Sequence, residues 1–362
     1  MSRSHWFSLL VSLIFLYLFL FDPSPAQLWN GTAGVGEALF RNRIHWAEVG
    51  EQIARMHLGW FSLAFSSLIL AMCVRAVRWQ VIVNPMKKLS FGVMFGLNNL
   101  GYMANNLLPM RLGELLRGIY LARKAGMPVS SAMATVVLER VFDMLGALGC
   151  LFALLVFVPL AILGDRGPLV HGLLPTLSWI VGTGLVLLVA LVVFRERVQS
   201  RLNRMALILP ARLADMVTRL LDSFIKGLAI LESPWRTLWL VVLTGILYGC
   251  YYLSLKTMML AMGLNSISLP LLAAHPLGSI LLVLVFVTVG YMIPAAPGAI
   301  GTSQYFTAIG LGLLGADASR AAGFALVNHF LTYVVLTSLG FLALFTLRIR
   351  FAELISIQQE RS

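Results

Sequence analysis

The chain has 362 residues, of which 59% are hydrophobic and 12% are charged, and its formal net charge is +12. A soluble domain of this length does not need so much apolar surface, whereas several membrane spans of about 20 residues do. The basic residues gather between the apolar runs, which is the positive-inside pattern of membrane proteins and argues against nucleic-acid binding. The sequence therefore predicts one integral membrane domain over residues 1–362.

Six apolar stretches are long enough to cross a bilayer. They cover residues 6–21, 57–78, 129–160, 172–194, 236–262 and 320–347. The first is similar to a signal peptide, but an uncleaved span is the better interpretation in a chain with several spans. Between the first two, residues 44–56 space their apolar side chains at helical intervals, which predicts an amphipathic helix at the membrane interface.

Two further apolar stretches are interrupted and do not fit single spans. Residues 90–124 are broken near Pro109, and residues 274–313 are broken between Pro294 and Gly301. Because proline and glycine end helices, each stretch predicts a re-entrant hairpin of two short helices. The first hairpin is expected to enter from the cytoplasm and the second from the outside.

Lysine and arginine positions set the predicted orientation. Arg75, Arg78, Lys87 and Lys88 mark the end of the second span as cytoplasmic, and the arginine-rich linker 195–235 does the same for the fourth. Both termini of this multi-pass protein then lie in the cytoplasm.

The order span, span, hairpin, span occurs twice, in residues 1–165 and 166–350. The second copy would be inverted relative to the first, and broken helices at matching positions of inverted halves are typical of a transporter's substrate site. The expected fold is therefore an all-α polytopic membrane protein with six full spans, two oppositely oriented re-entrant hairpins and an inverted repeat.

Charged residues follow the first break at intervals of three: Arg111, Glu114 and Arg117 share one helical face. Arginine presents a fork that fits phosphate, so this face suits an anionic lipid headgroup. Asn106, next to the break, can satisfy freed backbone groups. The alternative is that the three charged residues only pair with one another at the cytoplasmic interface.

The third span carries Glu139, Arg140 and Asp143 within an apolar run. One charge at membrane depth costs about 3 kcal/mol on insertion scales, so the three should be paired. Arg111 and Arg117 are the expected partners. The arrangement is either a structural clamp on the hairpin or a network that a phosphate or a proton can enter.

The second break opens a helix at Pro297, Gly298 and Gly301, and Gln304 follows. Free amides at a helix start can hold an anion or a carbonyl group. The alternative is a glycine and proline hinge without a ligand. Three isolated polar residues are expected to be satisfied within the protein or to snorkel: Lys256, His275 and His329.

Signatures of catalysis and of metal binding do not occur in the sequence. The three cysteines lie in apolar runs and have no metal-ligand spacing. We therefore expect neither an enzyme nor a cofactor.

Four places in the chain together resemble the transmembrane region of lysylphosphatidylglycerol synthases, a flippase-like membrane family. They are Arg78-Trp79, the P-x-R-x-G-E-x-x-R core within Asn106 to Arg117, Glu139-Arg140-x-x-Asp143, and Pro294-x-x-Pro297-Gly298-x-x-Gly301. The resemblance covers roughly residues 60–345 and implies a lipid-handling protein with re-entrant hairpins around a headgroup cavity. The soluble aminoacyltransferase domain of the synthases is not expected in this chain.

The sequence departs from the family at two positions: Ala299 stands where a second glycine is frequent, and Gln304 where glutamate is frequent. The resemblance therefore implies lipid handling without giving the lipid.

Three functions follow as hypotheses. The first is a flippase that moves an anionic phospholipid or polyprenyl-phosphate lipid, modified or not, across the inner membrane. The second is an accessory subunit that binds lipid for a glycosyltransferase or lipid-modifying enzyme without transporting it. The third, a membrane-embedded transferase, lacks a nucleophile and metal motifs. The expected partners are a membrane lipid, such an enzyme and a second copy of the chain, but no nucleic acid.

Overall fold

The computed structural model describes most of the chain. The described residues are 3–24, 27, 30, 34–108, 112–157, 179, 182–183, 186, 233–265, 268–293 and 295–349. Within them every regular element is a helix, apart from one isolated bridge between Phe21 and Asn42. The all-α prediction is confirmed for this part of the chain. Most of the predicted span 172–194 and nearly all of the linker 195–235 lie outside it.

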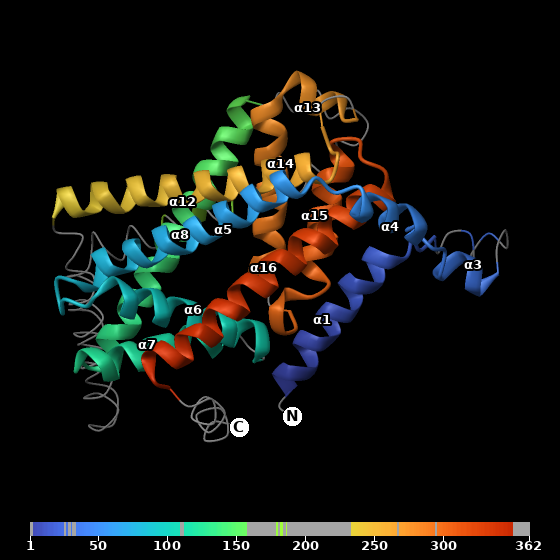
Figure 1. Ribbon diagram of the computed structural model, residues 1–362. Helices are drawn as coiled ribbons and strands as arrows, with labels where there is room; N and C mark the ends of the chain where they lie inside the picture. The colour runs from blue at the N-terminus through green and yellow to red at the C-terminus, as the bar shows by residue number, and fades with distance from the viewer. Residues whose placement is uncertain are drawn as a thin grey trace.

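Five long helices coincide with five of the predicted spans (Figure 1). They are α1 (Arg3–Leu20), α5 (Leu58–Val83), α8 (Val129–Phe157), α12 (Pro234–Ala261) and α16 (Ala318–Leu347). Helices α5, α12 and α16 are long and apolar enough to cross a membrane. Helix α8 has 29 residues but carries the three charges noted above.

Both interrupted stretches are pairs of short helices. The first pair is α6 (Phe91–Leu107) and α7 (Leu112–Ala125); the second is α14 (Pro276–Met292) and α15 (Thr302–Leu313), joined through the 3-10 helix η4 (Pro297–Ala299). Seventeen residues, the longest of these, extend about 26 Å at 1.5 Å per residue. That is shorter than the bilayer core of roughly 30 Å. Three small helices complete the fold: α3 (Val35–Leu39), α4 (Trp46–Ala54) and α13 (Pro270–Ala274).

The chain turns at the second break through backbone conformations that favour glycine. Gly298 has a φ of 70° and Gly301 a φ of 89°, in the region where side chains are disfavoured. Ala299 between them also has a positive φ, 56°. This is the position where the family often has glycine, so Ala299 carries some backbone strain.

Helices α5 and α12 lie side by side and antiparallel. The amide of His57 donates to the carbonyl of Ala261 at 2.9 Å, and the Ser254 hydroxyl donates to the carbonyl of Ala64 at 3.1 Å. Around this pair the packing is arranged twice. Helix α6 packs on α16 and α7 on α8, while α14 packs on α8 and α15 on α16. Exchanging α5 with α12, α6 with α14, α7 with α15, and α8 with α16 therefore maps the contacts among these eight helices onto themselves.

The segments expected outside the membrane meet at one end of the bundle. His45 donates its amide to the Ser319 hydroxyl at 3.1 Å, and the Gln52 side chain donates to the carbonyl of Met262 at 3.2 Å. The start of α6 lies at the opposite end, where Gly96 faces Leu347. The ends of these helices thus fall into two groups, one at each end of the bundle, as the predicted orientation requires. Which group is cytoplasmic stays a prediction.

The two breaks meet halfway along α16. The Asn106 side chain donates to the Thr337 hydroxyl at 3.0 Å, and the Tyr333 hydroxyl donates to the carbonyl of Asn106 at 3.4 Å. The Tyr333 ring also packs against Gly298 of the second break. Both hairpins therefore end near the middle of the bundle and face each other.

Candidate functional site: a buried cluster of arginines and carboxylates

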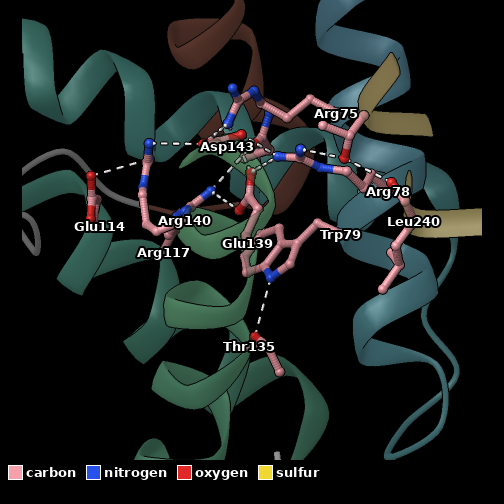
Figure 2. A network of polar contacts seen from close by, with 12 residues as sticks. Arg75, Arg78, Trp79, Glu114, Arg117, Thr135, Glu139, Arg140, Asp143 and Leu240 are labelled. Carbon is pink, nitrogen blue, oxygen red and sulfur yellow. Dashed lines mark hydrogen bonds and ion pairs between the residues drawn. The ribbon is translucent and has the colours of Figure 1, made fainter. Parts of the chain in front are cut away.

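Seven charged side chains come together between α5, α7 and α8 and form what we term the charged cluster (Figure 2). The members are Arg75, Arg78, Glu114, Arg117, Glu139, Arg140 and Asp143. The two arginines of α5 are three residues apart and the two carboxylates of α8 are four apart, so each pair shares one helical face. The faces of α5 and α8 point toward each other, with α7 closing the third side.

Glu139 is the fully buried centre of the cluster. Its Oε1 lies 3.0 Å from Arg75 Nη1 and 3.5 Å from Arg78 Nη2, and its Oε2 lies 2.6 Å from Arg117 Nη1. The side chains of Glu139 and Arg78 are both 0% exposed. A carboxylate surrounded by three guanidinium groups recovers the large cost of burying charge.

Asp143 connects the centre to a partly open rim. Its carboxylate pairs with Arg75 at 2.9 Å, with Arg140 at 3.1 Å and with Arg78. Arg140 reaches on to Glu114, with 3.1 Å between Nη2 and Oε1. The Arg140 and Glu114 side chains are 32% and 31% exposed, so the cluster is accessible on this side.

Aromatic and polar side chains surround the charges. The Arg117 guanidinium lies 5.0 Å over the Trp79 ring, and that of Arg75 lies 5.4 Å over the Tyr102 ring. These are favourable distances for cation–π contacts. On the α12 side, Arg78 donates to the Thr244 hydroxyl at 3.1 Å.

The charged cluster has more positive charge than negative. Four arginines face three carboxylates, which leaves a formal net charge of +1. Four buried guanidinium nitrogens have no hydrogen-bond acceptor within the described residues: Arg78 Nε, Arg117 Nε, Arg117 Nη2 and Arg140 Nε. Buried donors without an acceptor are costly, so the cluster is electrostatically suited to receive an anion.

Five of the predicted site residues belong to the charged cluster: Glu114, Arg117, Glu139, Arg140 and Asp143. The predicted pairing of Glu139 with Arg117 is confirmed. Arg111 lies outside the described residues.

Arg75 and Arg78, interpreted from the sequence as marking a cytoplasmic end of the second span, are buried inside α5 and bind the carboxylates of α8. The sidedness of that end stays a prediction. Arginine at the end of an apolar run normally reaches the interface, which is why it was counted there. Their spacing of three, together with two carboxylates in α8 that needed partners, is the signal that could have identified them.

The other predicted site residues lie at the breaks. Asn106 bonds α16 rather than the cluster, whereas its neighbour Asn105 accepts the amide of Gly113 at 2.9 Å and holds the start of α7. Pro297 and Gly298 form η4 at the second break.

The helix start at the second break is already occupied by its own side chain. Gln304 Oε1 accepts the amide of Gly301 at 2.8 Å and the hydroxyl of Ser303 at 3.0 Å. His329, expected to be isolated but satisfied, has its Nδ1 2.9 Å from Ser303 Oγ and stacks on Tyr291. The amide of Gly301 thus serves the protein's own structure, and the charged cluster is the better candidate site.

Long apolar helices around a buried charged centre define the class: a polytopic helical membrane protein with an internal polar site. The particular family follows from comparison. A family model described as the lysylphosphatidylglycerol synthase TM region matches residues 6–340, and the chain belongs to this family. No curated protein and no solved structure matches the chain. Membership supports a function connected with membrane lipids.

Proposed function

We propose that this protein moves a lipid with an anionic, phosphate-bearing headgroup across the bacterial inner membrane. The observation that carries the proposal is the charged cluster, with its net positive charge and with buried guanidinium nitrogens that have no acceptor in the described part of the chain. Membership in a lipid-related membrane family also supports this proposal. Within this proposal the protein is a translocase and not an enzyme.

A phosphate would complete the charged cluster chemically. Arginine binds phosphate oxygens through parallel N–H groups, and such charge-assisted bonds are about twice as strong as neutral ones. The headgroup would enter at the rim, where Arg140 and Glu114 are partly exposed. The ion pair between Arg140 and Glu114 would break when Arg140 binds the phosphate, and it would form again when the headgroup leaves.

The hairpins supply the route in this proposal. Both would be re-entrant, one from each side. This is supported by helices shorter than the bilayer core and by breaks that lie beside the middle of α16. The repeated packing around α5 and α12 is the arrangement expected of inverted halves. Rocking of the halves would expose the cluster to each side in turn while the lipid tails stay in the membrane.

The test is a flip assay in proteoliposomes that contain a phosphatidylglycerol with a headgroup label. We expect wild-type protein to equilibrate the label between leaflets, and Arg117→Gln to slow this equilibration by about tenfold or more, since one buried charge-assisted contact is worth 1.5 kcal/mol or more. The matched control is Arg55→Gln, which changes an exposed arginine in a surface pair.

The outcome also separates transport from simple lipid binding. Wild-type protein that retains phosphatidylglycerol through purification, but leaves the label in its original leaflet, would overturn translocation and favour the accessory subunit. Equal rates for wild type and Arg117→Gln would move the site away from the charged cluster.

A further inference from the structure

A cavity of about 540 Å³ opens between α8, α12 and α14, directly beside the charged cluster. This volume lies within the range of small-molecule sites, roughly 300–1,000 Å³. Along α8 the cavity extends from Phe142 to Ala153. Those eleven residue steps correspond to roughly 16 Å of helix.

Glycines create the space in this cavity. A β-carbon placed on Gly149, Gly245 or Gly249 would meet no atom within 4 Å. At Gly146 the same atom would collide with the Tyr248 ring, so α8 and α12 touch there and form the floor. The cavity is therefore open at these three glycines, because they have no side chains to fill the space between the helices.

The cavity offers hydrocarbon contact rather than hydrogen bonds at its cluster end. The Thr244 hydroxyl already donates to the carbonyl of Leu240 at 2.7 Å and accepts from Arg78. The Tyr248 hydroxyl donates to the carbonyl of Asp143 at 2.7 Å. Most of the other lining side chains are aliphatic or aromatic. A polar ligand would lose its hydrogen bonds to water here without replacement.

We infer that this cavity binds one hydrocarbon chain of the lipid whose phosphate occupies the charged cluster. The inference rests on the proposed function and adds the binding site of the tail. Charge complementarity selects the occupant: two lining residues of this apolar slot, Thr244 and Tyr248, bond Arg78 and Asp143 of the net positive cluster. An apolar slot next to a positive centre matches a long chain attached to an anion. The protein thus recognises headgroup and chain together.

The test uses a phosphatidylglycerol with a photoreactive diazirine at the middle of one acyl chain, reconstituted with the full-length protein in phosphatidylcholine vesicles. We expect light to attach the lipid to peptides of α8 and α12 that line the cavity. A phosphatidylcholine with the same diazirine chain tests the headgroup requirement and should label these peptides less.

The decisive variant is the double substitution Gly245→Leu and Gly249→Leu, which fills the cavity from α12. Labelling of the cavity peptides should fall about tenfold or more, because forcing a chain into filled space costs binding energy. Gly149→Leu fills it independently from α8. Gly92→Leu is the control, since Gly92 of α6 also has open space around it but lies away from the cavity.

Two results would overturn the inference. One is unchanged labelling of the cavity peptides in both filled variants, provided that their thermal unfolding midpoints match that of the control. The other is wild-type labelling confined to helices that do not line the cavity. Labelling is measured without transport, so cavity labelling with no flipping would sustain this inference while removing the proposed translocation.

Discussion

At the scale of single residues, the buried charged side chains of the described residues all belong to the charged cluster. The sequence identified the carboxylates of α8 and the Glu114 and Arg117 pair as unusual because charge within an apolar run is expensive. The spacing of Arg75 and Arg78 made them candidate partners for these carboxylates, but helical spacing alone does not show that α5 packs against α8. The site was thus predicted on α7 and α8 and missed on α5.

Glu139 is expected to be the most sensitive member of the charged cluster. Glu139→Gln would leave Arg75, Arg78 and Arg117 without their shared buried carboxylate. Breaking a buried ion pair by removing one partner costs about 3–5 kcal/mol. We expect a loss of this size in the free energy of unfolding in mixed micelles. Glu51→Gln, in the exposed pair with Arg55, should behave like wild type.

A double substitution tests whether the loss arises from uncompensated charge. Arg117→Gln added to Glu139→Gln removes one of the stranded arginines. The double variant should therefore be more stable than the sum of the two single losses predicts. Strict additivity would contradict the ion-pair account.

Ala299 gives a prediction of opposite sign. Its φ of 56° costs an alanine on the order of 1 kcal/mol, which a glycine avoids. Ala299→Gly should raise the free energy of unfolding by up to that amount, because flexibility gained in the unfolded chain offsets part of the gain. The same change at Ala274, at the end of α13 where φ is not positive, should not stabilise the protein.

At the scale of elements, side chains of specific helices hold the backbone at each break. Backbone groups freed within a membrane must find partners inside the protein. Asn105 supplies one for the first break, and Ser12 of α1 supplies two for the second. Ser12 Oγ donates to the carbonyl of Ile300 at 2.7 Å and accepts the amide of Ala296 at 2.8 Å. The breaks were predictable from proline and glycine, but the partner helix α1 was not.

Ser12→Ala should therefore destabilise the second break selectively. Two partly buried backbone groups would lose their partner, at a cost of up to about 1–3 kcal/mol for each group left unsatisfied. Hydrogen exchange at the amide of Ala296 should accelerate while exchange in α5 stays unchanged. Ser66→Ala is the matched control, because the Ser66 hydroxyl bonds only the carbonyl of Ser62 in its own exposed turn. Equal exchange in both variants would refute the role of Ser12.

At the scale of the whole molecule, the layout of spans and breaks was readable from the sequence because hydropathy fixes helix length. The repeated helix packing could not be predicted, since the two halves share no residue-level similarity. The structure reveals it through the contacts between helices, above all the antiparallel contact of α5 with α12.

Membrane sidedness can be measured directly. In a background without Cys73, Cys150 and Cys250, we expect Lys87→Cys and Lys124→Cys to react with an impermeant maleimide only from the cytoplasm. Both residues are exposed and flank the first hairpin. Labelling of the two from opposite sides would show that the hairpin crosses the membrane once.

The depth of the first hairpin needs a separate position. Leu108, at its break, is expected to be protected from reagent applied outside if the hairpin turns back within the bilayer. Rapid labelling of Leu108→Cys from the outside would instead make α6 and α7 two complete spans.

Tyr333 has a consequence that reaches beyond either hairpin. Its hydroxyl bonds the carbonyl of Asn106 and its ring packs on Gly298, so a single side chain touches both breaks. Two hairpins that share such a contact are thermodynamically coupled, and the coupling free energy has the same magnitude in both directions. We expect a perturbation at the second hairpin to reach the first through Tyr333 without passing through the charged cluster. Removing the ring should weaken this coupling while leaving every cluster charge in place.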